Sequence, residues 1–137
     1  MKKKWRVRLI FVVIVILVAV ALYLFFTFGN MYSVQAISVE AGSDIGKIQF
    51  NERIDFGDIP QGKSAVRTLI VENTGDNDHS IKIWVIGSIG QLIDVEPARS
   101  FDLNAGASQD INFQFNMPVS AAIGQKYTGR IVIFELP

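Results

Sequence analysis

The feature that most constrains this chain is an unbroken apolar run near its N-terminus. Leu9 to Phe28 contains only two polar side chains, Tyr23 and Thr27, both near the end of the run. At 1.5 Å per residue, a helix of ~20 residues spans about 30 Å, the thickness of the hydrocarbon core of a bilayer. A single span must be helical, because lipid offers its backbone no hydrogen-bond partner. We therefore expect a transmembrane helix over residues 9–29, with residues 9–28 in contact with the lipid bilayer.

The charges beside this run predict its orientation. A basic cluster precedes it, and no acidic residue occurs before Glu40. The cluster consists of Lys2, Lys3, Lys4, Arg6 and Arg8. Basic residues next to a span stay in the cytoplasm. The sequence therefore predicts a single-pass protein of the cell membrane, with a cytoplasmic tail over residues 1–8, a connector over 30–36 and one extracytoplasmic domain over 37–137.

Two other fates of the apolar run are open. A cleaved signal peptide has a shorter apolar core, and the best cleavage position, after Ala36, lies too far beyond this one. A pilin-like subunit is cut before its helix, but no small residue lies between Arg8 and Leu9 to serve as that site. We therefore expect the helix to be retained as an anchor.

The composition of the remaining chain excludes several functions. There is no cysteine, so the domain has no disulfide, no thiolate metal site and no cysteine nucleophile. Thirteen acidic residues and eight basic residues follow the cluster, and this balance argues against nucleic acid as a partner. The sequence also lacks an Asn-x-Ser/Thr glycosylation site, which favours a prokaryotic envelope.

The region beyond the connector has the period-two alternation of β-strands. In Asp110–Asn116, Ile111, Phe113 and Phe115 point to one side and the polar residues to the other. Ile81–Ile86 alternates similarly, Ala65–Glu72 is another strand, and Arg130–Phe134 is apolar on both faces. Shorter candidates are Ile37–Glu40, Lys47–Phe50, Ile54–Phe56, Leu92–Glu96 and Phe101–Leu103. Seven to nine strands with turns between them predict an all-β, immunoglobulin-like β-sandwich preceded by one transmembrane α-helix.

The order of landmarks along this domain resembles a known group. They are Ile54–Ile59 with Gly62, Val71–Gly75, Val95–Pro97, Phe101–Leu103 with Gly106 and Ser108, Ile111–Phe115, Pro118 and Tyr127–Ile133. The pattern is similar to the ASH group of immunoglobulin-like domains, which are related to major sperm protein, the first domain of pilus chaperones and bacterial choice-of-anchor surface modules. The resemblance implies a scaffold or docking module rather than an enzyme, and it implies no ligand residues.

Some of these positions have physical roles that can be stated independently. We expect Phe56 to anchor the core, with Gly57 allowing the chain to turn beside it. Asn73 and Gly75 suit the positive φ of a loop after a strand. The ring of Tyr127 should pack inward, with its hydroxyl aimed at a backbone group.

No catalytic, cofactor or metal site can be read from the sequence. Asp76 to His79 is the most polar stretch, yet a calcium loop needs more oxygen ligands and a glycine where Ile81 stands, so a solvated loop is the better interpretation. Asp78, His79 and Ser80 are neighbours in sequence, which is not the geometry of a catalytic triad. Asp94 and Glu96 share a strand face, as paired carboxylates do, but such residues usually face solvent.

Two places suit contact with another protein. Trp84, with Ile86 beside it, either faces outward as a contact surface or packs under a loop or against an edge. The last strand, with Ile133 and Glu135, offers strand addition if it lies at a sheet edge. We therefore expect a non-enzymatic adaptor that contacts an envelope or membrane protein. The alternative is a subunit that assembles with itself into a surface filament.

Overall fold

The computed structural model describes residues 2–39 and 53–137. The chain divides into two compact units, Met1–Asn30 and Met31–Pro137. The first contains helix α1 (Lys2–Phe28), whose side chains are almost all exposed. It is the one helix in the described part of the chain that is long and apolar enough to cross a membrane. Its length and composition suit a membrane anchor and a signal sequence alike.

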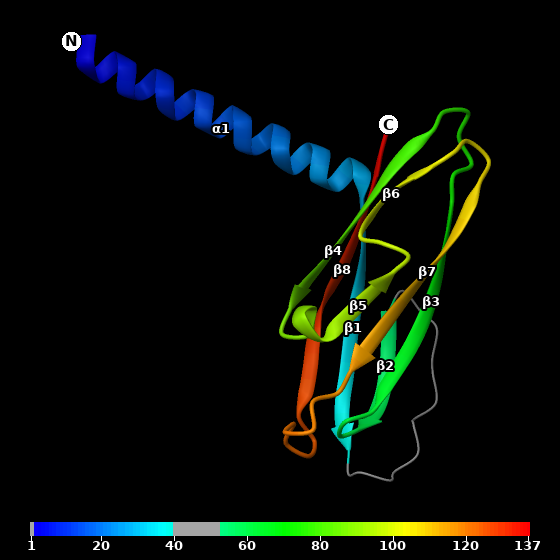
Figure 1. Cartoon of the computed structure of the whole chain (residues 1–137). Coiled ribbons are helices and arrows are strands. Elements are labelled where there is room, and N and C mark those ends of the chain that lie inside the picture. The colour runs from blue at the N-terminus through cyan, green and yellow to red at the C-terminus, as the bar shows by residue number, and fades with distance from the viewer. Residues whose placement is uncertain (1, 40–52) are drawn as a thin grey trace. The chain divides into compact units, whose positions relative to one another are not determined.

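The second unit is a sandwich of two sheets (Figure 1). The described ranges hold eight strands: β1 (Gly29–Val39), β2 (Arg53–Pro60), β3 (Ser64–Glu72), β4 (His79–Gly87), β5 (Ile93–Glu96), β6 (Ser100–Leu103), β7 (Ser108–Asn116) and β8 (Lys126–Leu136). A five-stranded sheet has the order β2-β1-β8-β4-β6, and a three-stranded sheet has the order β3-β7-β5. A short 3₁₀ helix, η1 (Gly90–Leu92), precedes β5. The predicted all-β sandwich behind one apolar helix is confirmed.

The predicted strand alternation matches the burial of these side chains. In β7 the side chains of Ile111, Phe113 and Phe115 are fully buried, while Asp110 is exposed. The Phe115 ring packs between the rings of Phe56 and Tyr127, at centroid distances of 5.5 Å and 6.0 Å. The predicted inward packing of Phe56 and Tyr127 is therefore confirmed: Phe56 is fully buried in the core, and the partly buried Tyr127 packs against it.

β8 is paired on both edges and buried in its middle. It lies between β1 and β4 (Figure 1). Ile131, Val132 and Ile133 are all buried. The sequence predicted this strand as apolar on both faces, and that is confirmed. Ile131 and Ile133 belong to the core, while Val132 is buried on the outward side of the sheet, where it lies opposite Trp84.

The expected connector over residues 30–36 is wrong, because those residues form most of β1. Val34, Ala36 and Ser38 alternate inward along this strand. β1 pairs in parallel with β2, Ser33 opposite Arg53, and it neighbours β8 on its other edge. Small and β-branched residues fit a strand that is bonded on both edges. The predicted strand Lys47–Phe50 lies outside the described residues.

Asn73 joins two loops at one end of the sandwich. Its buried side-chain Nδ2 donates to the carbonyl oxygens of Asn77 at 2.8 Å and Leu103 at 3.0 Å. Its Oδ1 accepts a hydrogen bond from the Gly75 backbone N–H at 3.1 Å. Gly75 does not have the expected positive φ, because this side-chain turn shapes the loop instead. Gly57 does have a positive φ, 72°, but it lies within β2, at an irregularity in the pairing with β1, and not at a turn.

Candidate functional site

The outward face of β4 carries the largest exposed side chains of the second unit's strands. Ile81 and Ile83 point into the core, so Lys82, Trp84 and Ile86 point outward. Trp84 is 54% exposed and Ile86 is 52% exposed. Of the two placements that the sequence allowed for Trp84, the structure therefore has the outward one.

The neighbouring strand β8 completes an apolar surface around Trp84. Val132 lies directly opposite Trp84 in the antiparallel ladder, and Phe134 lies opposite Lys82. The rings of Trp84 and Phe134 meet edge to face, with centroids 5.0 Å apart and an interplanar angle of 69°. Such pairs stabilise by about 0.5–1.5 kcal/mol beyond their buried area. We call Trp84, Ile86 and Phe134, together with the neighbouring cations Lys82 and Arg130, the tryptophan face; Val132 lies on the same side of the sheet but is fully buried.

Basic side chains surround the apolar residues of this face. Lys82 lies two residues before Trp84 on the same side of β4, and Arg130 lies opposite Ile86. Arg130 Nη1 is 3.1 Å from the sulfur of Met31. Arg99 lies beyond the other edge of β4, where its Nη2 donates to the Ile93 carbonyl oxygen at 3.0 Å. Asp102 is the acid on β6 near Lys82, and its Oδ1 accepts a hydrogen bond from Ser80 Oγ at 2.6 Å.

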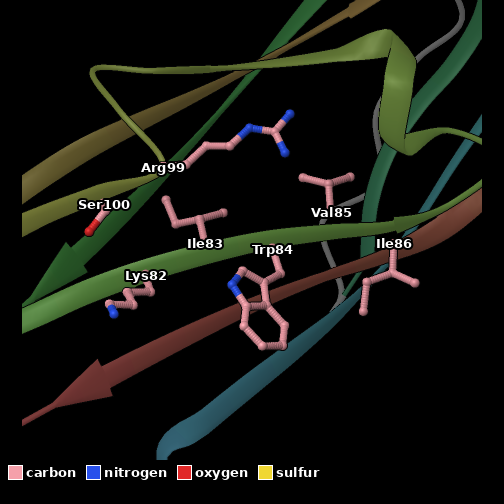
Figure 2. A pocket seen from close by; sticks show the side chains of 7 residues that line it. All are labelled: Lys82, Ile83, Trp84, Val85, Ile86, Arg99 and Ser100. Atoms are coloured by element: carbon pink, nitrogen blue, oxygen red, sulfur yellow. The ribbon is translucent and has the colours of Figure 1, made fainter.

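An open groove of about 590 Å³ runs along β4 beside the tryptophan face. Figure 2 shows Trp84 and Ile86 on one side of the strand, with Ile83, Val85 and Arg99 on the other. The groove is therefore lined by an aromatic ring, aliphatic side chains and the cations Lys82 and Arg99. Aromatic residues and arginine are enriched where proteins bind one another.

The backbone along this groove is only partly open. The pairing of β4 with β6 ends at Lys82 opposite Ser100, and one further bond joins the Ile83 N–H to the Arg99 carbonyl at 2.8 Å. Beyond it, Gly90 of η1 packs so closely on Val85 that a Cβ at Gly90 would lie 2.9 Å from the Val85 carbonyl oxygen. The side chains, rather than a free strand edge, are therefore what this groove offers to a partner.

The prediction that the last strand could bind a partner by strand addition at its edge is wrong. Ile133 is 2% exposed and belongs to the core, and Glu135 lies opposite Ile81 in the ladder with β4. β8 has a strand on each side, so it cannot accept another strand by edge pairing. β1 lies along the edge of β8 where strand addition was predicted, because the residues expected to form a connector form β1 instead.

In the polar loop near His79, the Asp78 carboxylate is hydrogen-bonded to the backbone of a neighbouring loop. Asp78 Oδ1 accepts a hydrogen bond from the Ala105 backbone N–H at 2.9 Å. Asp94 and Glu96 are exposed on β5, and Asp94 Oδ2 accepts a hydrogen bond from Asn116 Nδ2 at 2.9 Å. Within residues 2–39 and 53–137, no three His, Asp or Glu side chains are grouped as metal ligands would be.

The structure adds residues to the face that the sequence did not identify. Phe134, Val132, Arg130 and Arg99 come from β8 and from the segment before β6. The sequence showed only that Arg130–Phe134 is apolar on both faces. Their position beside Trp84 depends on the β4–β8 register, which no local pattern specifies.

The comparisons with known proteins concern the second unit. Residues 46–134 match a family model described as HYDIN/CFA65/VesB-like, Ig-like domain. No curated protein and no solved structure matches the chain.

Proposed function

Because the chain belongs to the HYDIN/CFA65/VesB-like family of Ig-like domains, we propose that it is a non-enzymatic module that binds a protein partner through the tryptophan face while α1 holds it in a membrane. An Ig-like domain of this kind is a binding or structural module, and such domains are typically not catalytic. The observation that supports the binding site is the half-exposed Trp84 packed against Phe134 between Lys82 and Arg130.

Membrane anchoring is the second part of this proposal. It is supported by the apolar length of α1 and by the basic residues at its start. In this proposal the tail is cytoplasmic, the sandwich is extracytoplasmic, and the membrane belongs to a prokaryotic envelope. The landmark residues from Ile54 to Ile133 further support placing the domain in the ASH group, whose members act as docking modules.

The topology can be tested with single cysteines, because the chain has none of its own. Ser88→Cys places a thiol on an exposed turn of the second unit, and Lys3→Cys places one in the basic tail. A maleimide that cannot cross membranes should label Ser88→Cys in intact cells and Lys3→Cys only after the cells are opened. Labelling of Lys3→Cys in intact cells, or an intact mass that lacks α1, would contradict the proposal.

The binding site can be tested with a photo-activated amino acid at position 86 of the full-length protein in native membranes. We expect a discrete protein adduct from that position, because Ile86 lies within the proposed contact. Ser120, which is exposed on the loop between β7 and β8, serves as the control position and should give no such adduct. Absence of any adduct from position 86 would rule out this face as the binding site.

A further inference from the structure

The second sheet presents a surface of opposite charge. The outward residues of β3, β7 and β5 include Asp110, Asp94 and Glu96, and no lysine or arginine is among them. Two apolar side chains lie beside these carboxylates. Ile70 is 61% exposed and faces Asp110 in the ladder, and Val66 is 48% exposed and faces Gln114. We call Val66, Ile70, Asp94, Glu96 and Asp110 the acidic face.

The acidic face and the tryptophan face are complementary in chemistry. Each combines exposed apolar side chains with charged ones. The tryptophan face holds the cations Lys82 and Arg130, with Asp102 as the acid nearby, whereas the acidic face holds three carboxylates and no cation. Complementary charges steer association and select the partner, while buried aromatic side chains supply most of the affinity.

They also match in position along the strands. Counted from the loop over residues 73–78 that joins β3 to β4, Ile70 and Lys82 lie about equally far along their strands. The same holds for Val66 and Ile86. Two sandwiches placed side by side with their strands parallel would therefore bring the carboxylates of one copy level with the cations of the other.

We propose that the tryptophan face binds the acidic face of a second copy of this chain. This inference rests on the proposed function, because it names the occupant of the same face. The two faces belong to different sheets, so each copy that binds a neighbour keeps its other face free. A heterologous contact of this kind repeats from copy to copy, and with the copies standing parallel it builds rows. Confinement to a membrane favours such rows, because it raises the effective concentration of copies.

A symmetric contact between two tryptophan faces is disfavoured by charge. It would place Lys82 and Arg130 of one copy against the same cations of the other. Like charges across an interface cost binding free energy. The acidic face offers these cations opposite charges instead.

The contact can be tested by cross-linking full-length protein in vesicles of phosphatidylcholine, a lipid without net charge. Ile86→Cys and Val66→Cys place one thiol on each face, in different copies, and a short bis-maleimide joins thiols that approach. We expect adducts between the two variants when they are mixed, and none from either variant alone. A double variant with both cysteines should form a ladder of longer products. Homodimers of Ile86→Cys would overturn the proposal in favour of a symmetric contact.

A charge exchange tests whether the opposite charges cause the contact. Lys82→Glu with Arg130→Glu makes the tryptophan face acidic, and Glu96→Lys with Asp110→Lys makes the acidic face basic. Each doubly substituted protein alone should lose cross-linking by about tenfold or more, and a mixture of the two should restore it. Lys126→Glu, at the start of β8 and outside the tryptophan face, is the matched control and should cross-link like the unchanged protein.

The outcomes separate this inference from the proposed function. Failure of the mixture to restore cross-linking, or equal cross-linking by every variant, would overturn the self-association. A different protein as the sole adduct from position 86 in native membranes would overturn it too, while leaving the proposed function intact. Binding of the purified protein to anionic vesicles through Lys82 and Arg130, with no copy-to-copy adducts, would contradict both.

Discussion

Gly87 and Gly129 face each other as the pair at the end of the β4–β8 ladder, and neither has room for a side chain. A Cβ on Gly87, whose φ is +106°, would lie 2.7 Å from the Gly129 Cα. A Cβ on Gly129 would overlap the Ile86 carbonyl oxygen and lie 2.7 Å from Ile89 Cγ2. This close approach lets the turn after β4 fold back over the sheet, and it positions Ile86 at the edge of the tryptophan face.

Gly129→Ala should therefore destabilise the second unit by about 2–3 kcal/mol, because backbone atoms must move to admit the methyl group. Urea unfolding of the full chain in detergent measures this, with Trp84 fluorescence followed in a Trp5→Phe background. Gly106→Ala is the control, since a Cβ there meets nothing within 4 Å and only the left-handed φ of +73° is unfavourable. Its cost should be about 1–2 kcal/mol. Equal stability of Gly129→Ala and the unchanged protein would contradict the tight approach.

Phe115→Ala should cost about 3–5 kcal/mol, because it removes a fully buried ring that packs on both Phe56 and Tyr127. The same unfolding measurement applies. Ile70→Ala, on the exposed face of the neighbouring strand β3, should change stability by no more than about 0.5 kcal/mol. A loss of similar size for both variants would show that Phe115 is not central to the core.

Asn73→Ala should cost about 2–3 kcal/mol, because the carbonyl groups of Asn77 and Leu103 and the N–H of Gly75 each lose a partner. Hydrogen exchange of the Gly75 amide should also become faster. Asn104→Ala, with an exposed side chain in the neighbouring loop, is the matched control and should leave both quantities nearly unchanged. An unchanged Gly75 exchange rate in Asn73→Ala would contradict the role of the Asn73 side chain in holding the two loops together.

Arg67, on β3, links that strand to the backbone of β2. Its Nε donates to the Asp55 carbonyl at 3.0 Å, and its Nη2 donates to the Phe56 carbonyl at 3.1 Å. Partial burial lowers the pKa of the guanidinium from its ordinary value, and the charge of Asp55 partly opposes this. Because the pKa is lower in the folded state, stability rises with pH only between the folded and unfolded pKa values, far above neutrality.

Arg67→Lys should therefore cost about 1–2 kcal/mol through the loss of the two-pronged bond to β2. The contribution of Arg67 itself should be the same from about pH 6 to pH 9, because the guanidinium remains charged throughout. Unfolding experiments at several pH values measure both effects. Lys63→Arg, an exposed exchange of the two cations in the turn before β3, is the control and should be neutral. A steep pH dependence lost on substituting Arg67 would contradict this account.

Local patterns in the sequence determined α1 and the strands with regular alternation. An apolar run the width of a bilayer, and the period of two in Ile111, Phe113 and Phe115, depend only on residues that are near one another in the chain. The same holds for the turn at Gly62. These elements, and the sandwich they imply, could therefore be predicted without knowing which strands are neighbours.

Only the tertiary structure decided which surfaces exist. Residues 30–36 of β1 were missed because their polar and small side chains resemble a linker, whereas residues 37–39 belong to the predicted strand Ile37–Glu40. Pairing with β2 and β8 is what makes the whole segment a strand. That pairing placed β8 in the centre and removed the predicted edge. The β4–β8 register brought Phe134 and Arg130 to Trp84, and the order of strands put the carboxylates of β5 and β7 on the other sheet. Register and strand order depend on contacts between residues far apart in the chain, and a one-residue shift would exchange inward and outward side chains without changing any local pattern.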